Sequence, residues 1–282
     1  FLAPGGEAVE RDSLLTWPQG NGWLTERLAL PLAERLYTGC LVQRITVQRH
    51  GIELDAWNVR TQALERWQAR YCIVALPLFV AARVLGTALP ALTAAAAQTS
   101  YAAWVVANLH LKQALHDRPG APPSWDNLIY PEGGRGAAQG LGYVDAMHQS
   151  LRPVPAATVL TWYRALGSTV SARQQLLTQP WSHWRDAVLT ELGSAHPDLP
   201  GKTSRIEVMR YGHAMAVPVP GARRSAAHAA LQSATLLTQQ RLQFAHSDLS
   251  GYSVFEEAFS HGQRAGQALA QRLRLRQVRQ LL

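Results

Sequence analysis

The sequence predicts an α/β protein of two lobes, in which one lobe is interrupted by the other. Residues 71–76 form a continuous apolar run that stops at Pro77, as expected of a strand buried on both faces. A second strand-like run, residues 242–245, leads through a loop of small residues into a long amphipathic helix. Between them lies a block of different composition that carries most of the tryptophans. The pattern favours a split lobe around an inserted one.

The predicted boundaries follow these changes in composition. Residues 1–80 and 222–282 form the two parts of the split lobe, and residues 81–221 form an inserted α+β lobe that ends at the rigid turn Pro218-Val219-Pro220-Gly221. With 282 residues, 47% hydrophobic and 16% charged, the chain has enough apolar material for a core and too little charge for disorder.

The first part of the split lobe begins with a predicted helix. Asn21 is its expected cap, leucines at 24, 28, 32 and 36 repeat along one face, and Pro31 predicts a kink. Residues 42–47 and 52–56 then alternate in hydrophobicity around Arg49-His50-Gly51, which predicts a hairpin.

The inserted lobe mixes both types of element. After an Ala-rich helical stretch, strands are predicted around residues 103–111, 142–147, 158–163 and 204–210, with a helix over 181–192. The last part of the chain predicts a helix over 225–239, the strand 242–245 and a helix from about Ser253. The inner face of that final helix is predicted to carry Val254, Ala258, Gly262, Ala265 and Leu269.

Charge and cysteine usage indicate few other sites. The net charge is +8, and only the tail concentrates basic residues, at Arg272, Arg274, Arg276 and Arg279. A solvated helix end is the simpler interpretation of the tail. The alternative function is a non-catalytic basic binding protein that uses the tail on an anionic surface. Cys40 and Cys72 lie in apolar runs and predict neither a disulfide framework nor a zinc site.

No signal peptide or membrane-spanning segment is recognisable, so the compartment stays open with the cytoplasm favoured. The oligomeric state is also open. The expected partner is a small-molecule substrate, with no nucleic acid and no integral membrane segment.

The unit formed by residues 242–258 is the best candidate for chemistry. The free N–H groups and positive dipole end of a helix form a site for phosphate or for negative charge developing on a ring. Asp248 at the end of the strand can accept hydrogen bonds from ribityl or ribose hydroxyls, and Gly251 lets the backbone approach closely. The alternative is that Asp248 or Ser253 simply caps a helix.

This unit resembles the closing motif of the flavin-containing amine oxidase superfamily, which includes phytoene desaturase and protoporphyrinogen oxidase relatives. The resemblance rests on Phe244-Ala245-His246-Ser247-Asp248, on Gly251-Tyr252-Ser253-Val254-Phe255-Glu256-Glu257-Ala258 and on Gly262. It implies that Asp248 holds the ribityl or pyrophosphate part of FAD. It also implies that Gly251, Ser253, Val254 and Phe255 lie at the helix start that faces the flavin pyrimidine.

A second block supports the resemblance. The helix over 23–36, the strand Val42-Gln43-Arg44-Ile45, the hairpin and the strand that ends at Ala75-Leu76-Pro77 are similar to the family's middle FAD-binding block. By this resemblance Val42 meets the adenine through its backbone, and Ala75 and Pro77 form a turn beside the cofactor. The implied fold is a partial FAD-binding Rossmann-like lobe with an inserted α+β substrate lobe.

The opening unit of the family has no counterpart in the sequence. A strand followed by GxGxxG binds the FAD pyrophosphate in such folds, and neither Pro4-Gly5-Gly6-Glu7 nor Gly133-Gly134-Arg135-Gly136 follows a buried strand. The sequence is therefore expected to be a fragment that lacks this segment, and FAD binding would be weakened without it.

On the substrate side, the resemblance points to the segment before the closing motif. Tyr211 is the predicted lining residue and His213 the predicted group for a polar contact or proton transfer. The alternative is that Tyr211 packs in the lobe and His213 bonds to the backbone. Trp162 and Tyr163 are poorer candidates because aromatic strands are usually core. His148 and His183 form no metal set. The expected function is an FAD-dependent oxidoreductase in which the flavin takes a hydride from a C–N or C–C bond.

Overall fold

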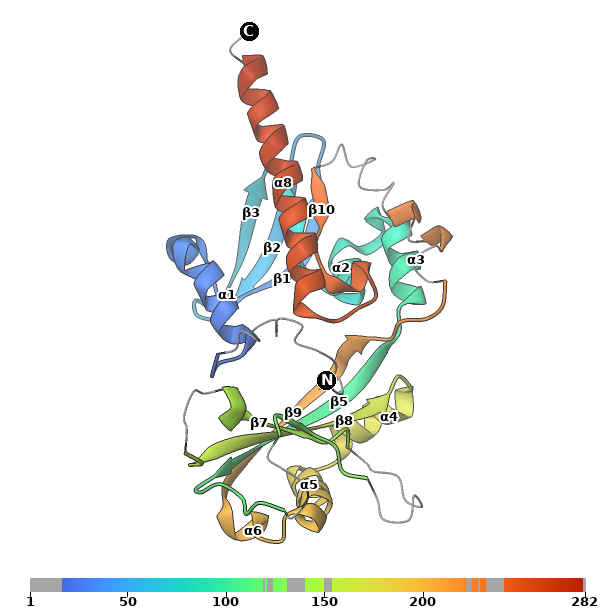
Figure 1. Cartoon of the computed structure of the whole chain (residues 1–282). Helices are drawn as coiled ribbons and strands as arrows, with labels where there is room; N and C mark the ends of the chain where they lie inside the picture. The colour runs from blue at the N-terminus through green and yellow to red at the C-terminus, as the bar shows by residue number, and fades with distance from the viewer. Residues whose placement is uncertain are drawn as a thin grey trace, which may run out of the picture. The chain divides into compact units, whose positions relative to one another are not determined.

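Internal contacts divide the chain into two units (Figure 1). Unit 1 consists of residues Phe1–Glu34, Val106–Arg164 and Pro180–Met209, and unit 2 consists of Arg35–Val105, Ala165–Gln179 and Arg210–Leu282. This computed structural model describes residues 17–118, 120, 124–130, 140–149, 154–221, 225–227, 229–231 and 241–280, the last six without their side chains. The lobe boundaries predicted from the sequence stay a prediction.

Unit 2 contains a three-stranded antiparallel sheet of order β1-β2-β3. The strands are β1 (Cys40–Val47), β2 (Ile52–Asn58) and β3 (Ala63–Ala69). The predicted hairpin is confirmed, with Val47 opposite Ile52. Strand β3 was not expected, because it is an exposed edge strand without a hydrophobic alternation. Its pairing along the whole of β2 holds it in place.

A second, parallel pair joins residues far apart in the sequence. Strand β4 (Cys72–Val74) pairs with β10 (Leu242–Phe244), with Cys72 opposite Leu242. Both strands were predicted from their apolar runs, and Val74 and Leu242 are buried. Burial of β4 on both faces, as predicted, is wrong in part, because Ile73 is 38% exposed. Two of the three segments of unit 1, Val106–Arg164 and Pro180–Met209, lie between β4 and β10 in the sequence. The pair therefore joins the first and the last segment of unit 2.

Helices complete the core of unit 2. Helix α2 (Leu78–Leu85) leads through the 3-10 turn η2 (Gly86–Ala88) to α3 (Pro90–Gln98). Helix α2 buries Leu78, Ala81, Val84 and Leu85, the spacing of one helix face. These residues pack in one cluster with Ile45 and Ile52 of the antiparallel sheet and Leu242 of the parallel pair. Helix α4 (Val170–Thr178), missed by the sequence prediction, begins at a Thr169 cap whose hydroxyl accepts from Ala172 N–H.

The last helix, α8 (Phe255–Gln280), runs beside β10 and follows the 3-10 turn η6 (Ser247–Leu249) (Figure 1). Its predicted inner face is wrong in part. Ala265 is buried, but Val254, Ala258 and Gly262 are exposed. Glu257 and His261 take the inward positions because they bond to buried Ser250. The predicted helix over 225–239 falls largely outside the described residues.

Unit 1 is built on a sheet of order β6-β7-β8-β5-β9, whose longer strands extend into the sequence of unit 2. Its strands are β6 (Asp126–Asn127), β7 (Tyr143–Asp145), β8 (Thr158–Gly167), β5 (Tyr101–Leu111) and β9 (Thr203–Ala216). All but the short β6 were predicted. Along β5 alternate residues are fully buried, as expected of a strand with one core face.

Helices α5 (Trp181–Ala195) and α6 (Leu199–Lys202) and the 3-10 helix η4 (Ala146–Gln149) also belong to unit 1. Helix α5 buries Trp184, Val188, Leu192 and Ala195. Glu191 on α5 accepts hydrogen bonds from the Trp162 indole on β8 at 3.1 Å and from Gly140 N–H at 2.8 Å. The helix is therefore fastened to the sheet by polar as well as apolar contacts.

The first predicted helix differs from expectation. Helix α1 (Asn21–Ala29) has Gly20 rather than Asn21 at its N-cap, and it passes into a 3-10 helix η1 (Leu30–Arg35) at the predicted Pro31 kink. None of its residues is buried, and Leu28, Leu32 and Leu36 are exposed. Within the described part of the chain, no helix has the length and apolar character needed to cross a bilayer.

Candidate cofactor and substrate site

The carboxyl ends of β4 and β10 lie at one edge of unit 2, because the two strands are parallel. The ladder continues by one bond, in which Ala245 N–H donates to the Val74 carbonyl at 3.1 Å. Residues 75–77 then lead into α2, and His246 leads into η6. In open α/β sheets ligands bind beyond the carboxyl ends of the strands, so this edge is the candidate site.

Asp248 ties the elements of this edge together. Its Oδ2 accepts from the Leu78 N–H at the start of α2, at 2.9 Å, and from the Tyr101 hydroxyl on β5. Its Oδ1 lies 3.2 Å from Nδ1 of His246, and its side chain is 1% exposed. The carboxylate therefore bonds to protein groups on three elements. The predicted contact of Asp248 with FAD stays a prediction.

The protonation of this network follows from its hydrogen bonds. Burial by itself would raise the pKa of Asp248, but hydrogen bonds from His246, Tyr101 and Leu78 outweigh burial and hold the pKa below its ordinary value. Burial, followed by the bond to Asp248, raises the pKa of Tyr101. Asp248 is therefore ionised and Tyr101 is a hydroxyl donor at neutral pH.

The loop between η6 and α8 carries the other predicted cofactor residues. Gly251 has a φ of 72°, in the left-handed region that favours glycine, and a Cβ placed there would meet nothing within 4 Å. The Ser253 hydroxyl accepts from Ala216 N–H at 2.8 Å, so it fastens this loop to the end of β9. The helix itself starts at Phe255, so Ser253 and Val254 precede it.

The start of α8 has the features expected of an anion or ring site. The first backbone N–H groups of a helix have no acceptors within the helix, and they carry its positive dipole end. Tyr252 and Val254, immediately before them, are exposed although apolar. The start of α8 thus combines open space at Gly251 with the exposed side chains of Tyr252 and Val254.

Val42 lies on β1, an edge strand of the three-stranded sheet. The pairing with β2 shifts between Val42 and Arg44, so a bulge at Gln43 interrupts the ladder. The Val42 side chain packs against the core of unit 2, which leaves its backbone as the group available at the edge. Ala75 and Pro77 lie where β4 passes into α2, and Pro77 is the N-cap of that helix.

The two predicted substrate-side residues lie on β9. The His213 ring stacks on Phe79 at a centroid distance of 4.3 Å and lies 5.7 Å from the ring of Tyr101. Burial, and then the charge of Arg173, lower the pKa of His213, which favours the neutral ring. Tyr211 is 48% exposed. The structure thus brings His213, but not Tyr211, into contact with the Asp248 network.

Arg173 on α4 is a residue that the sequence analysis missed. Its Nε donates to the Gly212 carbonyl at 2.8 Å, and one terminal nitrogen donates to the Tyr101 carbonyl at 3.2 Å. It therefore joins β5 to β9 beside His213. No local pattern marks such an arginine, because its partners are backbone carbonyls far away in the sequence.

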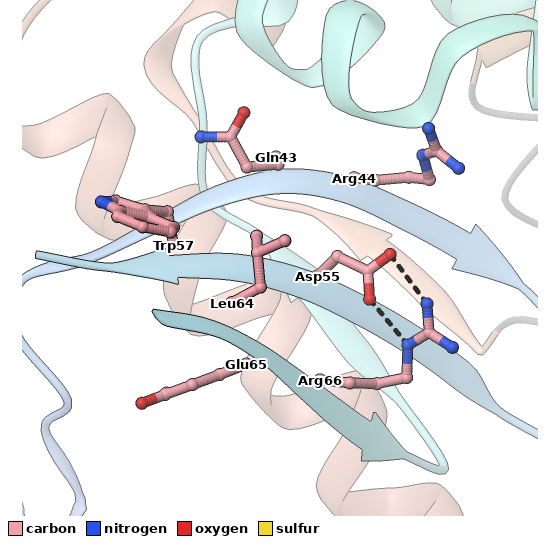
Figure 2. Close-up of a pocket in the computed structure, with 7 residues that line it drawn as sticks. All are labelled: Gln43, Arg44, Asp55, Trp57, Leu64, Glu65 and Arg66. Atoms are coloured by element: carbon pink, nitrogen blue, oxygen red, sulfur yellow. Dashed lines mark hydrogen bonds and ion pairs between the residues drawn. The ribbon is translucent and has the colours of Figure 1, made fainter. Parts of the chain in front are cut away.

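A shallow pocket of about 760 Å³ lies on the outer face of the three-stranded sheet (Figure 2). Arg66 donates to the two carboxylate oxygens of Asp55 at 2.7 and 3.1 Å, and Trp57 and Leu64 lie beside this pair. In the sequence, this face of β2 is marked by Glu53, Asp55 and Trp57, which alternate with the apolar residues of the other face. The pocket adjoins the bulge at Gln43.

The remaining aromatic and histidine residues considered in the sequence analysis lie in strands and helices of unit 1. Trp162 is fully buried, and the Tyr163 hydroxyl donates to Asp126 at 3.0 Å. His183 packs edge-on against Trp184, and His148 belongs to η4. Among the residues that the structure describes, no three histidine, cysteine or acidic side chains gather as a metal site. Cys40 and Cys72 are free thiols.

Comparison with known proteins identifies the family. The family described as flavin containing amine oxidoreductase matches residues 8–270. The chain belongs to this family. The resemblance found in the closing motif is thereby confirmed, and the cofactor of the family is FAD, as predicted. No curated protein sequence matches the chain.

Solved structures agree in fold. Cyclohexylamine oxidase from Brevibacterium oxydans IH-35A superposes with a TM-score of 0.63 at 18% identity, covering 90% of this chain and 53% of that one. A CLA-producing fatty acid isomerase from P. acnes gives a TM-score of 0.61 at 11% identity, covering 88% of this chain and 52% of that one. A double mutant of putrescine oxidase gives 0.55 at 12%, covering 89% and 53%. The predicted fold class is confirmed, and the chain spans about half the length of these proteins.

The residues of unit 2 fit part of an FAD molecule. The backbone at the β1 bulge suits a base read through main-chain groups, and the open start of α8 suits the ring. The sequence contains no strand followed by GxGxxG, so the residues that would hold the pyrophosphate in such a fold are not among those of this chain.

Proposed function

We propose that the protein to which this chain belongs is an FAD-dependent oxidoreductase acting on a C–N or C–C bond of a small organic substrate. The observation that carries the proposal is the edge where β4 and β10 end side by side and lead towards α2 and α8. Family membership over residues 8–270 supports it. FAD supplies the hydride acceptor, and the protein supplies orientation and a dry pocket.

The residues of this chain have distinct roles in the proposal. Val42 holds the adenine through its backbone, and Ala75 and Pro77 shape the turn beside the cofactor. Gly251, Ser253, Val254 and Phe255 present the start of α8 to the flavin ring. There the helix dipole stabilises negative charge on the ring.

Asp248 holds this arrangement in position in addition to its predicted contact with FAD. Its bonds to Leu78 and Tyr101 fix the start of α2 and the first residue of β5 relative to η6. A carboxylate that fastens three elements keeps the loop before α8 in one place, which a planar ring requires.

His213 is the proposed proton acceptor and Tyr211 the proposed lining residue. The lowered pKa of His213 supports this role, because a neutral imidazole can take a proton from a substrate ammonium or hydroxyl group. The exposed ring of Tyr211 supplies a surface for an apolar substrate.

The proposal is tested on the full-length protein loaded with FAD. A panel of amines, alcohols and unsaturated acids is added without oxygen, and loss of the oxidised flavin absorbance is followed. Reduction by one class supports the proposal and names the substrate class. Bound FAD that no member of the panel reduces would contradict it. His213→Gln should slow reduction by the active class more than it changes binding of that substrate.

A further inference from the structure

The Phe79 ring lies outside the hydrophobic core of unit 2. Helix α2 buries four residues of one face in that core, and the neighbouring Val80 packs against it. Phe79 is half-buried, but it is absent from the described residues that form this core or pack on it. Core packing therefore does not account for an aromatic ring at the second residue of α2.

The Phe79 ring contacts Tyr101 on β5 and His213 on β9. The His213 imidazole lies on the phenyl ring, with the centroids 4.3 Å apart and the planes 24° from parallel. The Tyr101 ring meets Phe79 edge-on, at 5.0 Å and 71°. Stacked and edge-on pairs are the arrangements that aromatic rings prefer. Phe79 thus joins the His213 ring to a residue that bonds to Asp248.

The plane of the His213 ring is set by stacking. An imidazole is usually oriented by a hydrogen bond at one of its nitrogens. In the part of the chain that the structure describes, no hydrogen bond joins either ring nitrogen of His213 to another residue. The stack on Phe79 is therefore the contact that orients the ring. His213 is also exposed, so its nitrogens are available to a substrate.

Asp248 fixes the backbone on the Phe79 side of the stack. Its Oδ2 accepts from the N–H of Leu78, the residue before Phe79, at 2.9 Å and from the Tyr101 hydroxyl. The start of α2 and the first residue of β5 are thereby held together, and the two rings keep their edge-on contact. Phe79 follows directly after the residue that bonds to the carboxylate predicted to contact FAD.

Arg173 fixes the backbone on the His213 side. Its Nε donates to the carbonyl of Gly212, the residue before His213, at 2.8 Å. One terminal nitrogen donates to the Tyr101 carbonyl at 3.2 Å. A circuit of contacts from Asp248 through the two stacked rings and back is thereby closed. Because the backbone is held on both sides, the phenyl ring determines how the imidazole lies.

The stack also affects the protonation of His213. Partial burial of the ring, followed by the charge of Arg173 on α4, lowers the pKa of His213. Phe79 covers one face of the imidazole and has no charge of its own. Tyr101 on β5 remains a neutral hydroxyl, because burial raises its pKa. The imidazole is thus kept in the neutral form, which can accept a proton.

We propose that Phe79 is a positioning residue for His213. Its ring sets the plane of the imidazole and keeps water from one face, so that a neutral nitrogen is presented to the substrate. The effect on the imidazole is independent of catalysis, whereas the effect on the reaction rests on the proposed function, in which His213 accepts a proton.

Two substitutions test the effect on the imidazole. Phe79→Leu removes the ring but keeps an apolar side chain, and Phe79→Tyr keeps the ring. The pKa of His213 is followed by NMR titration of the full-length, FAD-loaded protein without substrate, and its signal is the one absent from His213→Gln. The pKa should rise in Phe79→Leu, because water reaches the uncovered face, and should stay near the wild-type value in Phe79→Tyr.

Reduction of the flavin by the active substrate class tests the effect on the reaction. At saturating substrate, Phe79→Leu should slow reduction about tenfold, a part of the ~10²–10⁴-fold that a positioned base contributes. Because protonated His213 cannot accept a proton, the decline in rate at low pH should begin at a higher pH. The Kd values of substrate and FAD should change less than about twofold, since Phe79 contacts neither. Phe79→Tyr should restore the rate and its pH profile.

Val80→Ala is the matched control. It shortens the next side chain of α2, which packs against the core and not against His213. It should lower the stability of unit 2 but leave the His213 pKa and the pH profile of reduction as in wild type. A His213 pKa raised equally in Val80→Ala and Phe79→Leu would overturn the proposal, because any loosening of α2 would then be sufficient.

The remaining outcomes distinguish the role of Phe79 from the proposed function. If Phe79→Leu changes neither the His213 pKa nor the reduction rate while His213→Gln slows reduction, the role of Phe79 is refuted and the proposed function stands. If Phe79→Leu raises the pKa but neither variant slows reduction, Phe79 does position the ring, and His213 is not the proton acceptor.

Discussion

Replacement of Asp248 by alanine should be among the most destabilising single changes in unit 2. The carboxylate is 1% exposed and accepts from Leu78 N–H at 2.9 Å and from the Tyr101 hydroxyl. Alanine leaves both donors buried without an acceptor. A buried donor without a partner costs about 1–3 kcal/mol. The expected loss in the free energy of unfolding is therefore roughly 2–6 kcal/mol for the two donors, a large share of the ~5–15 kcal/mol typical of domains.

Asp248→Asn separates charge from hydrogen bonding. Its amide oxygen can still accept from Leu78 and Tyr101, so we expect a loss of about 1 kcal/mol at neutral pH. The pKa of Asp248 is depressed in the folded state. Its contribution is therefore full above the unfolded value of about 3.9 and is lost as the pH falls through the lower folded value. The difference between wild type and Asp248→Asn should shrink below about pH 4.

Urea unfolding at several pH values measures these differences. A loss below about 1 kcal/mol for Asp248→Ala at neutral pH would refute the reasoning, because it would mean that neither donor needs the carboxylate. FAD affinity is measured on the same variants. The direct contact predicted from the sequence requires roughly ten- to a hundredfold weaker FAD binding in Asp248→Ala. Tyr101→Phe, which keeps the carboxylate, should bind FAD nearly as wild type does if that contact is direct.

Three further predictions concern single contacts. Gly251→Ala should cost about 1–2 kcal/mol of stability, measured by urea unfolding, because its φ of 72° strains any residue with a Cβ although the space is open. Tyr143→Phe should cost about 1–3 kcal/mol in the same assay, because it removes the hydroxyl bonded to the buried His196 Nε2. Arg173→Gln should raise the pKa of His213, followed by NMR titration, because it removes a nearby positive charge that lowers this pKa in addition to burial. An unchanged His213 pKa in Arg173→Gln would contradict this third prediction.

The sequence predicted the elements of unit 2 whose signals are local. Residues 71–76 and 242–245 were recognised as strands because buried parallel strands are uniformly apolar. Their pairing with each other was not predicted, because the paired residues Cys72 and Leu242 are far apart in the sequence. The closing motif placed Gly251 in the loop, as found. Ser253 was expected at the start of the helix but precedes it, and its bond from Ala216 N–H was not predicted.

Failures of the sequence analysis share one cause, which is dependence on distant partners. Strand β3 is largely exposed and has no alternation, so only its pairing with β2 makes it a strand. The inner face of α8 was misjudged because Glu257 and His261 are polar, and their inward position depends on Ser250. The leucines of α1 predicted a buried face, but none of that helix is buried in the structure.

The candidate site likewise has residues that the sequence predicted and contacts that it did not. Asp248 was found from its place in a motif, but its bonds to Leu78 and Tyr101 come from elements that no pattern connects to it. The contact between the Tyr143 hydroxyl and His196 Nε2 in unit 1 was likewise not predicted, because the two residues are far apart in the sequence. A sequence motif can identify residues predicted to face a shared cofactor. The contacts that hold those residues in place are known only from the folded structure.

FAD binding by the full-length protein tests the central claim most directly. The purified protein is stripped of flavin, and its unfolding temperature and visible absorbance are followed as FAD is added. The account predicts a flavin spectrum altered by binding and a saturable rise in unfolding temperature. At an FAD concentration of 100 times Kd the stabilisation should be about 2.7 kcal/mol. A folded protein that neither perturbs the spectrum of FAD nor gains stability from it would contradict the account.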